Sequence, residues 1–93
     1  SPQGGALSVL TFNVLGREGR SEPLLKVLRA ENADIVCLQE LTPPQAEAIR
    51  AQLQTLYPYQ YLAPRPGVSG MGVLSKTALL PETHPPGDEW VGD

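Results

Sequence analysis

Two short apolar segments, separated by one amphipathic stretch, constrain the fold of this chain more than any other feature. Residues 7–14 and 35–39 are rich in apolar and β-branched side chains, which is typical of buried strands. Between them, Ser21 is a favourable N-cap residue, and apolar side chains recur at helical spacing over residues 24–28. A strand, a helix and a second strand in this order most simply form a parallel, right-handed βαβ unit.

A second helix and two more strands are predicted to follow. Thr42 precedes two prolines, which suits a helix start, and apolar side chains then recur at helical spacing over residues 46–56. Residues 59–62 and 71–75 have strand patterns on either side of the turn-rich loop 64–70, which indicates an antiparallel pair. The order β-α-β-α-β-β therefore predicts an α/β fold with a mixed sheet and both helices packed on one face.

The composition sets the domain organisation and excludes several classes of protein. The 93 residues have room for one domain, and residues 7–80 carry the periodic patterns. We expect residues 1–6 to be a linker or a tag remnant, and residues 81–93 to be a Pro/Gly-rich acidic tail. The single cysteine, Cys37, excludes an internal disulfide framework and a cysteine-rich zinc module. No apolar run approaches the roughly 20 residues of a membrane span, and no signal peptide is recognisable, so the sequence leaves the compartment open.

Two polar residues stand where the first two strands end. Asn13 lies near the carboxyl end of the first strand, and Glu40 lies just past the end of the second. The carboxyl ends of neighbouring parallel strands share one sheet edge, where α/β sheets place their ligand sites. Carboxylate and amide oxygens suit a hard cation such as Mg²⁺. A Glu leaving the core for solvent and an Asn in a turn are the alternative interpretations.

Three segments carry a resemblance to a known family. Residues 11–14 (TFNV), 33–40 (ADIVCLQE) and 70–76 (GMGVLSK) resemble, in order and separation, the first three signature segments of the endonuclease/exonuclease/phosphatase superfamily, which includes the DNase I-like nucleases. The resemblance implies that the chain is the N-terminal half of a DNase I-like four-layer α/β sandwich. It also implies hydrolysis of a phosphoester by an activated water in the presence of Mg²⁺, with Mn²⁺ as an alternative ion.

The resemblance also implies roles for single residues. Glu40 would be a direct metal ligand, and Asn13 would support the metal or bind the scissile phosphate, so both are candidate catalytic residues. Arg17, in the loop after the first strand, is a weaker candidate for a phosphate contact, and a solvated loop arginine is the alternative. The family's later catalytic motifs, Asn-x-His, Gly-Asp-x-Asn and Ser-Asp-His, are absent from these residues. His84 lacks the strand context of a catalytic histidine, and we therefore expect this fragment to be inactive by itself.

Two different functions are consistent with these patterns. As part of a phosphoesterase, the chain would act on a phosphoester of unspecified class, and its net charge of −3 argues mildly against nucleic acid. As a non-catalytic interaction module, it would use the unpaired edge that half a sheet leaves exposed. Such an edge invites pairing with another chain, so self-association is the alternative hypothesis.

Overall fold

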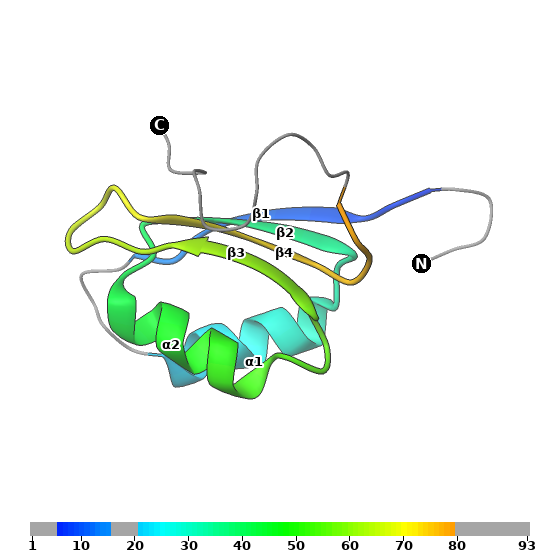
Figure 1. The fold of residues 1–93 in the computed structure, drawn as a ribbon, viewed down its shortest axis with the longest axis horizontal. Coiled ribbons are helices and arrows are strands. Elements are labelled where there is room, and N and C mark those ends of the chain that lie inside the picture. Colours follow the sequence, from blue (N-terminus) through cyan, green and yellow to red (C-terminus); the bar gives the residue numbers. More distant parts are fainter. Residues whose placement is uncertain (1–5, 16–20, 80–93) are drawn as a thin grey trace.

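A computed structural model describes residues 6–15 and 21–79 of the chain. These residues form one four-stranded sheet and two helices in the order predicted from the sequence (Figure 1). The elements are β1 (Val9–Asn13), α1 (Glu22–Glu31), β2 (Ile35–Gln39), α2 (Pro43–Gln52), β3 (Tyr59–Ala63) and β4 (Met71–Ser75). No helix in the described ranges is long and apolar enough to cross a membrane.

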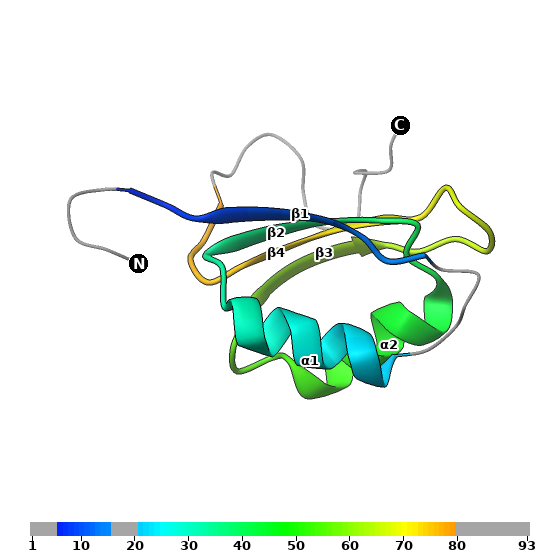
Figure 2. The ribbon, with the colours of Figure 1, turned by 180° about the vertical axis from the view of Figure 1, so that it is seen from behind.

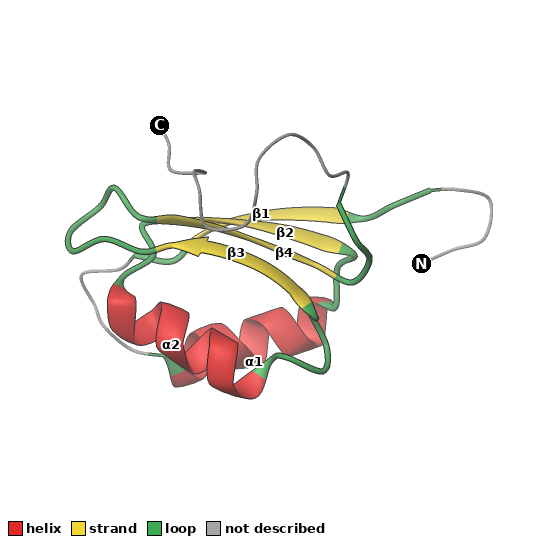
Figure 3. Ribbon diagram, in the orientation of Figure 1, coloured by secondary structure: helices red, strands yellow, loops and turns green. Residues whose placement is uncertain are grey.

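The sheet is mixed, as predicted, and its strand order is β1-β2-β4-β3. β1 and β2 are parallel, whereas β4 pairs in antiparallel fashion with β2 on one side and with β3 on the other. Both helices lie on the same side of the sheet in opposite views of the molecule (Figures 2 and 3). The predicted α/β class, with both helices on one face, is therefore confirmed.

Both helices begin where the sequence predicts, but only one of the two predicted N-cap side chains makes a hydrogen bond at the helix start. α1 follows Ser21 and ends at Glu31. The next residue, Asn32, has a left-handed backbone, and its N–H donates to the Leu28 carbonyl at 3.0 Å. The Ser21 side chain makes no capping hydrogen bond. At the start of α2, the Thr42 N–H and hydroxyl instead share the Gln45 Oε1, at 3.2 and 3.0 Å. These two hydrogen bonds stabilise the N-terminus of α2 in the manner of a capping box.

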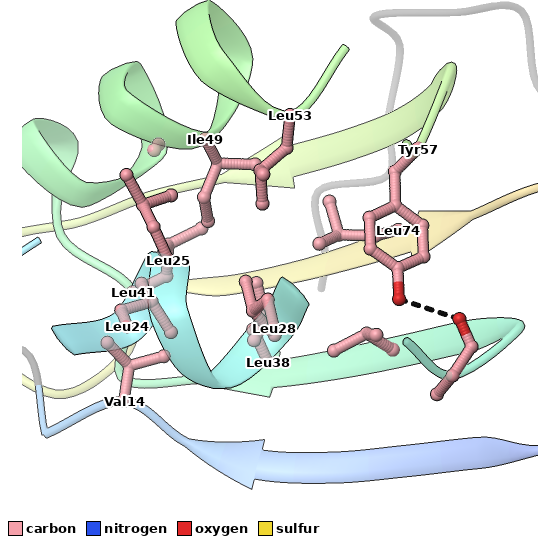
Figure 4. Packing of buried hydrophobic residues seen from close by; sticks show 13 residues of the cluster. Val14, Leu24, Leu25, Leu28, Leu38, Leu41, Ile49, Leu53, Tyr57 and Leu74 are labelled. Atoms are coloured by element: carbon pink, nitrogen blue, oxygen red, sulfur yellow. Dashed lines mark hydrogen bonds between the residues drawn. The ribbon is translucent and has the colours of Figure 1, made fainter. Parts of the chain in front are cut away.

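The core lies between the helices and the covered face of the sheet (Figure 4). Its largest fully buried side chains come from both helices, the sheet and the loops that join them. The apolar spacing predicted for the second helix continues beyond its end. α2 ends at Gln52, and the next residue, Leu53, is still buried. Tyr57 adds a polar anchor: its buried hydroxyl donates to the Ala33 carbonyl at 2.6 Å, just before β2. Burial raises the pKa of this phenol, with a smaller contribution from the nearby Asp34 charge.

Ser8 and Asp34 join the beginnings of β1 and β2. The Ser8 N–H and hydroxyl donate to Asp34 Oδ2 at 3.0 and 3.1 Å, and the Asp34 N–H donates to Ser8 Oγ at 2.9 Å. The Ser8 carbonyl also accepts from the Ile35 N–H at 3.0 Å, which fixes the parallel register at this end. The hydrogen bond from the Ser8 backbone N–H is the main cause that lowers the pKa of the Asp34 carboxyl. Burial opposes this effect, and the hydrogen bond from the Ser8 hydroxyl adds to it.

The lowered pKa of Asp34 predicts a pH-dependent stability. The folded chain favours the ionised carboxylate, so this contribution is complete above the ordinary pKa of 3.8 and is lost as pH falls through the lower folded value. We expect Asp34→Ala to be less stable than wild type at pH 7 and to lose less further stability between about pH 5 and pH 2. Urea unfolding across that range measures both effects. Glu31→Gln, at an exposed position, is the control. If the free energy of unfolding of wild type and of Asp34→Ala changed equally with pH, a lowered pKa of Asp34 in the folded chain would be contradicted.

Candidate metal and phosphoester site

The parallel pairing of β1 and β2 places the two candidate residues at adjoining strand ends. Asn13 is opposite Gln39 in the register, and the Val14 N–H donates to the Gln39 carbonyl at 2.8 Å. Glu40 is the next residue along the chain after Gln39. Asn13 and Glu40 therefore lie at the same edge of the sheet, the carboxyl-terminal edge of its parallel strands, where the sequence predicts a ligand site.

Asn13 is exposed and takes part in a turn. Its Oδ1 accepts a hydrogen bond from the Leu15 N–H at 2.9 Å, and Leu15 has a left-handed backbone with φ of 58°. The turn interpretation of Asn13 is therefore correct, but the turn uses only one of the hydrogen-bonding positions of the side chain. Oδ1 has a second lone pair, and the amide NH₂ is a hydrogen-bond donor. This side chain can therefore donate to a phosphate oxygen or a metal-bound water, and its Oδ1 can still contact a metal directly.

Glu40 combines a left-handed backbone with a buried, unpaired carboxylate oxygen. Its φ is 61°, which is uncommon for a residue with a side chain, and such strain persists only where the surroundings hold it. Its Oε1 has no hydrogen-bond partner among the described residues although it is buried. Leaving a carboxylate oxygen buried and unsatisfied costs free energy. A divalent cation would supply the missing partner, so the chemistry of this group fits Mg²⁺ or Mn²⁺.

The described residues do not supply a complete metal site. Within them, no group of three or more His, Cys, Asp or Glu side chains could hold an ion. Magnesium does not need one, because it is often held by one or two protein carboxylates, several waters and substrate phosphate oxygens. Arg17 and His84 lie outside the described residues, so the structure does not place either of them.

Comparisons with known proteins point to one family and one fold. The sequence profile of the Endonuclease/Exonuclease/phosphatase family matches residues 10–92. Among solved structures, the chain is similar to D. rerio TDP2, in a crystal structure complexed with single strand DNA product, with a TM-score of 0.58 and 23% sequence identity. The likeness covers 75% of this chain and 29% of that chain, so the present chain spans less than a third of it. No curated protein sequence matches the chain.

The unpaired Glu40 oxygen predicts that the side chain reduces stability when no metal is present. An amide costs less to desolvate than a carboxylate, so Glu40→Gln is expected to raise the free energy of unfolding of the metal-free chain by about 1 kcal/mol at pH 7. Urea unfolding in the presence of EDTA measures this difference in the free energy of unfolding. Glu47→Gln is the matched control, since Glu47 is exposed and pairs with Arg50 at 2.8 Å. A loss of stability in Glu40→Gln would show that the carboxylate is already satisfied.

Proposed function

The chain belongs to the Endonuclease/Exonuclease/phosphatase family, and from this premise we propose that it forms part of a metal-dependent phosphoester hydrolase. In the proposed site, Glu40 is the protein ligand of Mg²⁺, with Mn²⁺ as an alternative, and Asn13 donates to the substrate phosphate or to a metal-bound water. When bound, the ion would polarise the phosphoryl oxygens and favour formation of the attacking hydroxide.

The observation that carries the proposal is the buried Oε1 of Glu40, just after β2, which has no hydrogen-bond partner among the residues that the structure describes. A carboxylate in this condition is costly without a cation, and the residue that bears it also has a left-handed backbone. Solvent exposure, the alternative interpretation from sequence, would leave both oxygens hydrated. The buried oxygen therefore favours a metal ligand over a residue that merely leaves the core.

Asn13 acts in the proposal through its amide NH₂. The hydrogen bond from the Leu15 N–H to Oδ1 fixes the orientation of the carboxamide and directs the NH₂ away from that turn. A neutral donor binds a phosphate oxygen without adding charge next to the ion. Arg17, which comes four residues after Asn13 in the sequence, is proposed as a further phosphate contact.

This chain alone is proposed to bind metal and phosphate rather than to carry out the whole reaction. None of its 93 residues supplies the later Asn-x-His, Gly-Asp-x-Asn or Ser-Asp-His motifs, which the resemblance associates with the general base and with charge stabilisation. We therefore propose that the chain alone does not turn over phosphoesters. The class of phosphoester stays open, although the DNA product held by D. rerio TDP2 makes nucleic acid one candidate.

A second candidate function, self-association, is supported by the sheet itself. β1 and β3 are the outer strands, and no described strand pairs with their outer edges. On the face that the helices leave open, Val9, Tyr59 and Met71 expose 61%, 40% and 50% of their surfaces. Open edges and exposed apolar side chains both favour contact with another sheet, and a second copy of this chain provides one.

Metal binding by Glu40 predicts a thermal shift. At an Mn²⁺ concentration about 100 times its Kd, binding contributes about 2.7 kcal/mol, which corresponds to a rise in Tm of roughly 10–20 °C for a domain of this size. Differential scanning fluorimetry should show this rise for wild type and for Glu47→Gln, and none for Glu40→Gln. An equal shift in all three proteins would contradict the proposed ligand. Turnover of bis(p-nitrophenyl) phosphate by wild type, abolished in Glu40→Gln, would contradict the proposed inactivity of the chain alone.

Self-association predicts a concentration-dependent mass. Light scattering coupled to size exclusion should give values above the monomer mass of 10.0 kDa as concentration rises. Tyr59→Lys places a charge on the outer strand β3 and should return the mass to that of the monomer. Thr55→Lys, in an exposed turn beyond α2, is the control and should leave the mass unchanged. A wild-type chain that stays monomeric at every concentration and unfolds cooperatively would exclude this second function.

A further inference from the structure

The residue after Glu40 is held on both sides by the loop between β3 and β4. The Leu41 N–H donates to the Gly70 carbonyl at 3.1 Å, and the Leu41 carbonyl accepts from the Arg65 N–H at 3.0 Å. The Leu41 side chain is fully buried and belongs to the core cluster (Figure 4). Glu40 therefore lies between two fixed points, the end of β2 before it and Leu41 after it.

This close contact depends on Gly70 having no side chain. A Cβ built on Gly70 would lie 1.8 Å from the Leu41 carbonyl oxygen, 2.6 Å from the Arg65 nitrogen and 2.9 Å from the Leu41 carbonyl carbon. All three are backbone atoms, so none can rotate away as the end of a side chain can. Real Cβ atoms essentially never come closer than 3.0 Å, so any larger residue at position 70 would force the Gly70 and Leu41 backbones apart by about 1 Å.

We propose that Gly70 is a positioning residue for Glu40: its bare Cα lets the Leu41 backbone dock on the β3–β4 loop, and this docking holds Glu40 in its left-handed conformation with Oε1 buried. The inference rests on the proposed function in taking Glu40 as the metal ligand. A left-handed residue with a side chain returns readily to other backbone conformations when its neighbours release it. A shift of about 1 Å at Leu41 would therefore move the carboxylate, and ligand positions tolerate little displacement.

Two other glycines of the same region provide matched controls. Gly67, in the β3–β4 loop, has φ of 84°, but a Cβ there would meet nothing within 4 Å. Gly67→Ala therefore introduces backbone strain into the loop without touching Leu41. Gly72, in β4, would place its Cβ 3.0 Å from the ends of the Leu41 and Leu62 side chains, which can move. Gly72→Ala therefore adds a methyl group to the core without pressing on the backbone.

Hydrogen exchange of the metal-free chain tests the positioning directly. We expect the Leu41 amide to exchange at least about 10-fold faster in Gly70→Ala than in Gly67→Ala or Gly72→Ala, because the hydrogen bond to the Gly70 carbonyl is lost. Circular dichroism checks that each variant is folded. Equal protection of Leu41 in the three variants would overturn the inference, whether or not the chain binds metal.

Mn²⁺ titration, followed by the EPR signal of the free ion, supplies the second readout. Gly70→Ala should bind about 10–100-fold more weakly than wild type, whereas Gly67→Ala and Gly72→Ala should bind within about twofold of it. Binding by Gly70→Ala as tight as by Gly67→Ala would overturn the inference. A wild-type chain that binds no Mn²⁺ would instead contradict the proposed function, and Leu41 exchange would still decide the role of Gly70.

A second variant tests the inference if Gly70→Ala does not fold. Arg65→Pro removes the N–H that donates to the Leu41 carbonyl and adds no atom at position 70. Arg65→Pro should accelerate hydrogen exchange of the Leu41 amide and weaken Mn²⁺ binding, as Gly70→Ala is expected to do. Unchanged exchange and unchanged binding in Arg65→Pro would overturn the inference.

Discussion

The parallel pairing of β1 with β2 is the interaction on which the candidate site depends. The hydrogen bond from the Val14 N–H to the Gln39 carbonyl closes the pair at its carboxyl end, and the register sets Asn13 beside Gln39. A slip of one residue would turn Asn13 to the opposite face of the sheet and separate it from Glu40. The side chains that carry the proposed chemistry thus take their relative positions from backbone pairing rather than from contact with each other.

The two ends of this strand pair are fixed by different means. At the amino ends, the Ser8 hydroxyl donates to the Asp34 carboxylate and accepts from the Asp34 backbone N–H. Beyond the carboxyl ends, Leu41 docks by its backbone against Gly70, where a side chain would not fit. A residue with a strained backbone persists only in such surroundings, so the rigid ends explain how Glu40 keeps a left-handed conformation and a buried oxygen. The proposed ligand is thus positioned by the fold before any ion arrives.

The local patterns of the sequence predict the elements and their order because periodicity and capping residues act over a few positions. The parallel βαβ unit and the placement of Asn13 and Glu40 at one edge of the sheet follow from topology rules, so they too were predictable. What the sequence does not reveal depends on contacts between distant segments. The insertion of β4 between β2 and β3, the bond from Tyr57 to Ala33, and the docking of Leu41 on Gly70 all belong to this class. The glycine at position 70 is visible in the sequence, but the backbone it accommodates is not.

Glu40, just after β2, is the proposed ligand of a divalent cation. Paramagnetic broadening by substoichiometric Mn²⁺, observed residue by residue in the NMR spectrum of the 15N-labelled chain, tests this role of Glu40 most directly. The account predicts that the amide signals of Glu40, Leu41 and Asn13 broaden first, and that the effect at these residues disappears in Glu40→Gln. Early broadening confined to other acidic residues, with Glu40 unaffected, would contradict the account.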